Sequence, residues 1–231
     1  MNIIVTGATK GIGRAIASIF SAEGHTLLLS ARNQKDLQET AQALSSKYGN
    51  IVHVFPADLS KKTEAIAFGN WCLQFGTPDI LVNNAGRFVP GAIYNEADGI
   101  VEEMIETNLY SAYHLTRVIV PAMIAKKSGH VFNICSIASV KPYSNGGSYG
   151  ISKFAMLGFS KNLREELMPH LVKVTAVLPG AVYTDSWSGS GVDPNRIMED
   201  NDIAMMVLAA SKLSPQACVE EILLRPQLGD L

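Results

Sequence analysis

The segment TGATKGIG at residues 6–13 decides the fold that we expect for this chain. It follows the short apolar run NIIVT and precedes a helix-length segment that should end at Gly24. Its glycines, Gly7, Gly11 and Gly13, permit a tight turn, close approach of the backbone to a phosphate, and close packing of helix on strand. Unpaired N–H groups at the start of that helix would face an anion, so the segment predicts an anion-binding turn.

Apolar runs of strand length recur along the chain, and amphipathic segments of helix length separate them. After the first run they are TLLLSA, IVHVFPA, DILVNN, GHVFNICS, VKVTAVLP and CVEEILLRP. Helices are expected at 15–23, 34–48, 61–75, 98–126 and 149–168, with Asn33 and Ser60 as N-caps of the second and third. Strands separated by helices predict an α/β fold of Rossmann type: a doubly wound, seven-stranded parallel sheet with helices on both faces.

Size and composition predict a single domain over residues 1–231, because 47% of the residues are hydrophobic and 17% are charged. A net charge of -2 without blocks of like charge argues against nucleic acid or a membrane as partner. The cysteines Cys72, Cys135 and Cys218 lack metal-ligand spacing, so we expect free thiols and no metal site. No signal peptide or apolar span of about 20 residues is recognisable, which indicates a cytoplasmic protein.

The stretch SYGISKF at 148–154 places a phenol and an amine, Tyr149 and Lys153, four positions apart. In a helix this spacing puts both side chains on one face, one turn apart. The ammonium would then favour the ionised phenol and lower the tyrosine pKa, which suits a proton donor. Taken alone, the pair is more typical of an ordinary helix that has a buried aromatic ring and a solvated lysine.

Several motifs together are specific: the glycine turn, NNAG at 83–86, Ser136, Tyr149 and Lys153. On these residues the chain resembles the short-chain dehydrogenase/reductase family from residue 2 to about residue 225. The family uses the T-G-x-x-x-G-x-G form of the glycine turn, and its order of motifs selects Ser136 as the site serine.

The resemblance implies a catalytic set of Asn108, Ser136, Tyr149 and Lys153. Tyr149 would be the general acid or base at the substrate oxygen, and Ser136 would hydrogen-bond the same oxygen. Lys153 would lower the pKa of Tyr149 and bind the nicotinamide ribose, while Asn108 would hold a water that links Lys153 to solvent. Each residue also has a purely structural reading, as a turn, helix or surface residue.

The resemblance further implies a set of cofactor-binding residues at the ends of the strands. They are Gly7, Thr9, Lys10, Gly11, Ile12, Gly13, Arg32, Asp58, Leu59, Asn84, Ala85, Gly86, Tyr149, Lys153, Pro179, Gly180, Val182 and Thr184. Enzymes of this architecture that use NAD carry an acid after the second strand, but LLLSARNQ has Arg32 there, and Lys10 lies in the glycine turn. Two cations suit a ribose 2′-phosphate, so we predict NADP(H), although both could be solvated surface charges.

The substrate pocket is expected from residues 136–143 and 87–94 and from a small loop and helix region at about 184–213, in which 184–195 is a candidate lid. Its apolar walls would come from Phe88, Val89, Val140, Tyr143 and Trp187. Whether Arg87 or Trp187 contacts substrate stays open, and the short segment after the last strand should leave that side of the pocket open. The implied activity is reduction of a ketone or aldehyde, with a 3-oxoacyl thioester or a pterin-type carbonyl as candidates.

Two readings without turnover remain: an NADP(H)-binding redox sensor and a scaffold. The long helix at 98–126 carries more apolar positions than one core-facing stripe needs: Ile100, Met104, Tyr110, Leu115 and Ile119. A surplus of this kind is usually covered by a partner, so we expect a homodimer or homotetramer.

Overall fold

The sheet is continuous and entirely parallel in the computed structural model, which describes residues 1–184, 187 and 191–230. Its order is β3-β2-β1-β4-β5-β6-β7. The strands are β1 (Asn2–Thr6), β2 (Thr26–Ala31), β3 (Val52–Pro56), β4 (Ile80–Asn83), β5 (Gly129–Ile134), β6 (Val172–Pro179) and β7 (Glu221–Leu224). The chain winds outward in both directions from β1 and β4, so the ligand crevice belongs at the carboxyl ends of these two strands. The predicted fold class is confirmed.

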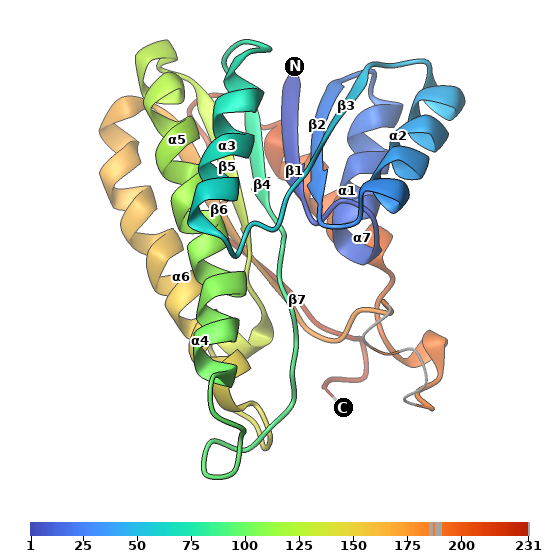
Figure 1. Cartoon of the computed structure of the whole chain (residues 1–231), viewed down its shortest axis with the longest axis vertical. Coiled ribbons are helices and arrows are strands. Elements are labelled where there is room, and N and C mark those ends of the chain that lie inside the picture. Colours follow the sequence, from blue (N-terminus) through green and yellow to red (C-terminus); the bar gives the residue numbers. More distant parts are fainter. Residues whose placement is uncertain (185–186, 188–190, 231) are drawn as a thin grey trace.

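Helices cover both faces of the sheet (Figure 1). One face carries α1 (Gly11–Ala22), α2 (Gln34–Tyr48) and α7 (Asp200–Ser211), and the other carries α3 (Lys62–Leu73), α5 (Ser111–Lys126) and α6 (Gly147–Leu167). Strand β1 shows why the runs are continuously apolar: Ile3 and Val5 enter the core on the α1 side, and Ile4 enters the opposite core. Both cores are built from the same strands.

The helix boundaries test the predicted caps. Asn33 caps α2, because its side chain accepts from the backbone N–H groups of Lys35 (2.9 Å) and Asp36 (3.2 Å). Ser60 does not cap α3, so that prediction is wrong: Lys61 is the N-cap, and the Ser60 hydroxyl donates to Asp58 instead. Helix α1 starts four residues earlier than expected, since the glycine turn runs directly into it.

The long helix expected at 98–126 is interrupted. It begins as α4 (Ile100–Ile105) after Gly99, which has φ +90°, continues as a π-helical turn at Glu106–Tyr110, and resumes as α5, which passes through Pro121. Turns of this type insert an extra residue and are frequent at functional sites. This one contains Asn108, whose side chain it turns into the interior.

The prediction that this helix exposes apolar side chains to a partner is only partly correct. Met104, Leu115 and Ile119 are fully buried within the protein, so they leave no apolar surface for a partner. Tyr110 is exposed as expected, and it belongs to a set of exposed apolar side chains on α4, the π-helical turn, α5 and α6. That set is Val101, Tyr110, Tyr113, Ile151 and Phe154.

The cysteine side chains are free thiols, as predicted. Burial raises the pKa of both Cys72 and Cys135, which keeps these thiols protonated. Over residues 1–184, 187 and 191–230, no three His, Cys, Asp or Glu side chains gather as metal ligands would. Within the same residues no helix has the length and hydropathy needed to cross a bilayer.

Candidate active site

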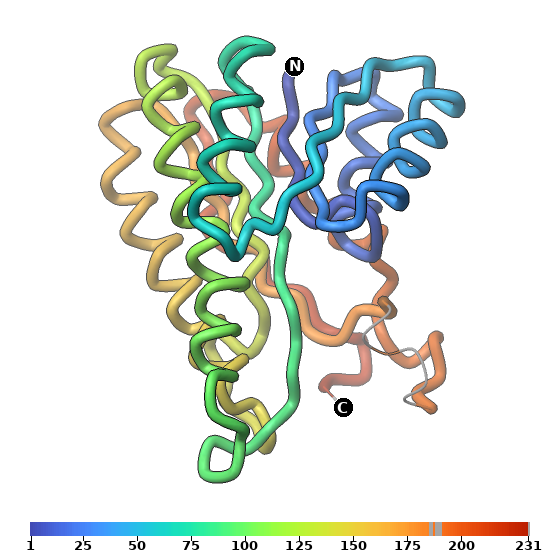
Figure 2. Tube along the Cα trace, in the orientation of Figure 1, coloured from blue at the N-terminus to red at the C-terminus, as the bar shows by residue number. Residues whose placement is uncertain are grey.

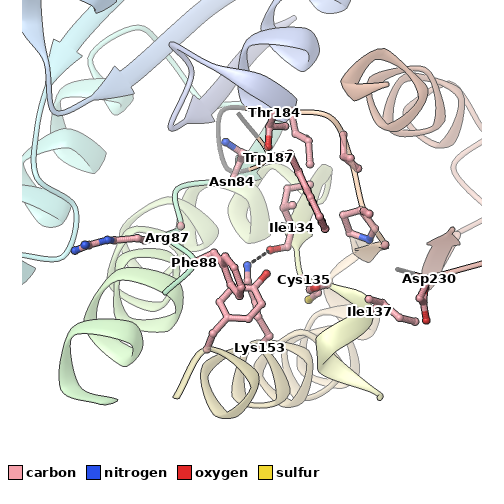
Figure 3. A pocket seen from close by; sticks show the side chains of 18 of the residues that line it. Asn84, Arg87, Phe88, Ile134, Cys135, Ile137, Lys153, Thr184, Trp187 and Asp230 are labelled. Atoms are coloured by element: carbon pink, nitrogen blue, oxygen red, sulfur yellow. Dashed lines mark hydrogen bonds between the residues drawn. The ribbon is translucent and has the colours of Figure 1, made fainter. Parts of the chain in front are cut away.

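A cavity of about 580 Å³ opens at the carboxyl edge of the sheet, next to the switch between β1 and β4 (Figure 3). Many of the predicted site residues line it. They are Ile12, Asn84, Gly86, Ser136, Tyr149, Lys153, Pro179, Gly180, Val182 and Thr184. The cavity therefore brings together residues that are distant in sequence but follow β1, β4, β5 and β6 in turn.

The glycine turn lies against its neighbours with no space for side chains. Gly7 and Gly11 have φ +63° and +48°, the left-handed region that favours glycine. A Cβ on Gly11 would lie 2.8 Å from the Thr184 methyl group, and one on Gly13 would overlap both the Gly7 carbonyl and the Asn84 side chain. The side chain of Lys10, the N-cap, does not cap α1, and a helix start of this kind suits a dinucleotide phosphate.

Thr6 fixes the NNAG segment to the glycine turn, a role that the sequence reasoning missed. Its buried hydroxyl accepts from the backbone N–H groups of Asn84 and Ala85, both at 2.9 Å. The Asn84 amide in turn donates to the carbonyls of Thr6 (2.9 Å) and Gly7 (3.2 Å). The threonine that opens TGATKGIG was visible in sequence, but its partners were not.

A buried chain of amides runs beneath the cavity and was also missed. Asn83 donates to Asn133 (2.8 Å) and to Thr116 (3.0 Å), and Asn133 donates to Ser160 (2.9 Å). These bonds tie β4 to β5, α5 and α6 below the site, so they fix the helix that carries Tyr149 and Lys153. The signal was the presence of asparagine in the otherwise apolar runs DILVNN and GHVFNICS.

Tyr149 lies on the first turn of α6 with its ring against Phe88, at 4.9 Å between centroids and in an edge-to-face arrangement. Burial raises the pKa of the Tyr149 hydroxyl, and a hydrogen bond with Ser136 lowers it in part. Ser136, after β5, also accepts from the Ala138 N–H at 3.1 Å. When a substrate oxygen enters the cavity, the Ser136 hydroxyl can turn its one hydrogen from Tyr149 to that oxygen.

Lys153 is buried, one helical turn beyond Tyr149 as predicted. Its ammonium donates to the Ile134 carbonyl at 2.9 Å, the dashed line in Figure 3, and lies 5.8 Å from the centroid of the Tyr149 ring. Burial lowers the pKa of Lys153. The pKa of Tyr149 is raised rather than lowered as expected, because desolvation of the phenol outweighs the favourable influences, and a lowering effect of Lys153 stays a prediction.

Asn108 lies directly beneath the cavity rather than in its wall. Its amide donates to the Arg87 carbonyl (3.0 Å) and to the Ser152 hydroxyl (2.9 Å), and its oxygen accepts from the Arg87 N–H at 2.7 Å. The side chain therefore braces the segment after β4 against α6, with one oxygen lone pair left for a water.

The predicted 2′-phosphate corner lies beside the glycine turn and outside the main cavity. Arg32 directly follows β2 and Lys10 is the N-cap of α1; both are exposed, and β1 and β2 are neighbouring strands. At the end of adjacent β3, the Asp58 carboxylate accepts from the N–H (3.2 Å) and hydroxyl (2.8 Å) of Ser60, and Leu59 is buried. The residue that follows β2 is Arg32, where an acid would favour NAD.

On the substrate side, Phe88, Tyr143 and Trp187 line the cavity as expected. Val89 and Val140 do not line it, which corrects those two predictions; Val140 points to solvent because it ends a short turn after Ser136. Arg87 reaches the rim, but its guanidinium turns away and pairs with Glu103 (Figure 3).

Within the loop and helix region expected at 184–213, Thr184 and Trp187 line the cavity. Residues 185–186 and 188–190 of the predicted lid lie outside the described residues. Helix α7 packs with α1 in the main core through Ile203 and Val207, and none of its residues lines the cavity.

The segment after β7 returns to the cavity, contrary to the expectation that it is too short to do so. Asp230 lines the wall together with Lys141, and the two side chains pair at 3.0 Å. Arg225 also bonds the Asp230 carboxylate, and Arg196 donates to three main-chain carbonyls between Leu228 and Asp230. The contacts of Lys141 and Arg196 with this segment span 32 to 89 residues, so no local pattern could indicate them.

Comparison with known proteins agrees with this architecture. The family model for short chain dehydrogenase matches residues 1–194. Sepiapterin reductase of Chlorobaculum tepidum is 33% identical over 238 residues, which cover 99% of this chain and 97% of that protein. The uncharacterized oxidoreductase YvrD of Bacillus subtilis is 38% identical over 183 residues, or 79% of this chain and 69% of that protein.

Solved structures are similar over the whole chain. An alcohol dehydrogenase from Thermococcus sibiricus complexed with 5-hydroxy-NADP superimposes with a TM-score of 0.91 at 28% identity, covering 100% of this chain and 98% of that one. L-sorbose reductase from Gluconobacter frateurii, complexed with NADPH and L-sorbose, gives 0.89 at 28% identity, with 96% and 94% covered. With its glycine turn, its parallel sheet and a family match over most of its length, the chain belongs to the short-chain dehydrogenase family of oxidoreductases.

Proposed function

We propose that the protein is an NADP(H)-dependent oxidoreductase that reduces a ketone or aldehyde to an alcohol. The observation that carries this proposal is the convergence of Ser136, Tyr149 and Lys153 on one cavity beside the glycine turn. A proton donor, a second hydrogen-bond donor and a buried cation are what carbonyl reduction requires of the protein. A scaffold or sensor would not need the three groups together.

The choice of NADP(H) rests on the 2′-phosphate corner and on similar structures. Arg32 and Lys10 supply cations where the ribose phosphate would lie, and the related alcohol dehydrogenase and L-sorbose reductase bind NADP-type cofactors. The bound cofactor supplies the hydride. Lys153 would bind the nicotinamide ribose and the segment from Pro179 to Thr184 would hold the nicotinamide, which is supported by their position in the cavity wall.

The residues of this chain supply the proton and the surroundings. Tyr149 donates its hydroxyl proton to the substrate oxygen, and Ser136 turns its one hydroxyl hydrogen from Tyr149 to the same oxygen. A raised pKa keeps Tyr149 protonated at neutral pH, which suits reduction. Phe88, Tyr143 and Trp187 provide apolar walls that exclude water.

The test is NADPH consumption with a panel of aldehydes, ketones, diketones and 3-oxoacyl thioesters, followed by absorbance. Pterin-type carbonyls belong in the panel because of the similarity to sepiapterin reductase. Turnover with any member supports the reductase, and the panel ranks the substrate classes. Tight NADPH binding without turnover of any member would favour the sensor instead.

Arg32→Ala should reduce the preference for NADPH over NADH. The guanidinium is exposed at the end of β2, and one charged hydrogen bond to a phosphate contributes roughly 1 to 3 kcal/mol. Titration of both cofactors against the native protein and the variant measures this difference. Lys47→Ala, at the far end of α2, is the control and should leave both affinities unchanged. Equal affinity of the native protein for both cofactors would overturn the assignment.

We also propose that the protein is a homodimer or homotetramer through α4, α5 and α6. The exposed Val101, Tyr110, Tyr113, Ile151 and Phe154 form an apolar surface that solvent does not favour. Closed symmetric association of identical chains is the common way to cover such a surface. Sedimentation at micromolar concentration should give a multiple of 24.9 kDa, and a monomer would exclude the proposal.

A further inference from the structure

Glu96 lies in the segment between β4 and α4, half-buried, and both of its carboxylate oxygens are bonded to one residue. Oε1 accepts from the backbone N–H of Ser148 at 3.0 Å, and Oε2 accepts from the Ser148 hydroxyl. Ser148 is buried in the first turn of α6 and directly precedes Tyr149. A carboxylate distant in sequence is therefore attached to the turn that carries the proton donor.

Two glycines make room for this carboxylate. A Cβ on Gly147 would overlap Oε1 of Glu96, and a Cβ on Gly91 would lie 2.7 Å from its Cγ. Gly147 also has φ +30°, and the Gly91 N–H donates to the Asn145 carbonyl at 3.0 Å. Side chains at either position would expel the carboxylate, so the glycines and Ser148 together form a socket, which we call the Glu96 socket.

The Glu96 socket supplies the start of α6 with a cap that its own sequence lacks. The N-cap of α6 is Gly146, which has no side chain to accept from the first N–H groups. A carboxylate at a helix N-terminus is stabilising because it satisfies an N–H group and faces the positive end of the helix. Figure 2 shows the segment before α4 running beside the start of α6, at the lower end of the molecule.

The same segment carries a wall of the cavity. Phe88 lies in it and packs edge-to-face on the Tyr149 ring at 4.9 Å. Glu96 itself does not line the cavity. Its carboxylate thus fixes two things relative to each other: the helix turn that holds the phenol, and the segment that holds the ring against which the phenol packs.

We propose that Glu96 is a positioning residue of the reductase site, which holds Tyr149 and Phe88 in their working geometry through the Glu96 socket. The inference rests on the proposed reductase function. Proton transfer needs the donor within hydrogen-bond reach of the substrate oxygen, and small displacements of a reacting group are costly. The role follows from geometry and requires no contact between Glu96 and substrate.

Glu96→Ala should lower kcat about 10- to 100-fold, the scale of a displacement of about 1 Å at a reacting group. Its NADPH affinity should stay within about twofold, because most cofactor contacts lie at the glycine turn and strand ends, and Lys153, one turn further along α6, keeps its own bond to the Ile134 carbonyl. Glu96→Gln should retain most of the rate, since its amide oxygen can accept from the Ser148 N–H and its amide nitrogen can donate to the Ser148 hydroxyl. Hydrogen exchange at residues 148–150 should accelerate in the Ala variant and stay near native in the Gln variant.

Asp79→Ala is the matched control. Asp79 also accepts from a backbone N–H, that of Asn2 at 2.7 Å. It lies before β4, at the amino ends of the strands, whereas the cavity lies at their carboxyl ends. Its loss should lower stability without changing kcat per folded molecule, which separates positioning from a general loss of stability. If Glu96→Ala does not fold, Ser148→Ala removes one bond of the socket and should still lower kcat several-fold.

Native kcat in Glu96→Ala, or a Gln variant as slow as the Ala variant, would overturn the positioning role. Native kcat in Ser148→Ala would do the same where that variant replaces Glu96→Ala. Failure of the proposed function has a different signature, in which the native protein reduces no carbonyl. In that case the exchange rates at residues 148–150 still decide whether Glu96 holds the first turn of α6.

Discussion

Tyr149→Phe is expected to abolish most of the reductase turnover while folding and NADPH binding stay close to native. The substitution removes only the hydroxyl, and the ring can keep its edge-to-face contact with Phe88. General acid catalysis contributes about 10²- to 10⁴-fold in rate, so kcat should fall by at least that order. The measurement is kcat at saturating NADPH, with the cofactor dissociation constant and the melting temperature taken on the same sample.

The pH dependence adds a second readout of the same group. Burial raises the pKa of Tyr149, so the phenol stays protonated through the neutral range and the reduction rate should be level there. It should fall only at alkaline pH, as Tyr149 ionises, whereas the reverse oxidation should become faster. Tyr143→Phe is the comparison, since it removes another phenol hydroxyl from the cavity wall and should cost far less in kcat. A Tyr149→Phe protein with most of its rate would refute the mechanism.

The parallel sheet and the glycine turn were predictable because their determinants are local. Apolar runs such as NIIVT are buried on both faces, so their residues do not alternate between apolar and polar. Such a strand is recognised instead by its short length and its β-branched residues. Gly7 and Gly11 adopt left-handed conformations that few other residues tolerate. Asn33 caps α2 through its own neighbours in sequence, so its role was readable without the fold.

What the sequence could not predict depends on contacts between distant segments. Asn83 and Asn133 are 50 residues apart and meet only because β4 and β5 are neighbours. Lys141 and Asp230 are 89 residues apart, so the return of the last segment to the cavity had no local signal. The π-helical turn at Asn108 and the Glu96 socket belong to the same class, since each is stabilised by packing against α6.

Lys153→Met is expected to lose both turnover and cofactor affinity without loss of stability, a pattern different from that of Tyr149→Phe. The ammonium is proposed to bind the nicotinamide ribose, so its removal should weaken NADPH binding by roughly 1.5 to 3 kcal/mol, the scale of a charged hydrogen bond. kcat should fall as well, because the ribose and the phenol beside it are no longer oriented by Lys153.

The melting temperature expected for Lys153→Met follows from the burial of Lys153. Its ammonium donates to the Ile134 carbonyl at 2.9 Å. A buried charge with a neutral partner is costly, which is why burial lowers the pKa of Lys153, and a methionine of similar length removes that cost. The Ile134 carbonyl loses one donor, which offsets part of the gain. The melting temperature should therefore stay level or rise while activity falls, as happens where function requires an unfavourable group.

Three measurements on Lys153→Met separate the roles of this lysine: the NADPH dissociation constant, kcat and the melting temperature. Weaker NADPH binding with a stable fold supports the ribose contact, and unchanged binding with low kcat would restrict Lys153 to the chemistry at Tyr149. A lysine that served only the packing of α6 would lower the melting temperature when replaced and leave both NADPH affinity and kcat per folded molecule unchanged. That last result would remove Lys153 from the site altogether, because a buried cation that neither binds the cofactor nor assists the phenol has no part in the reaction.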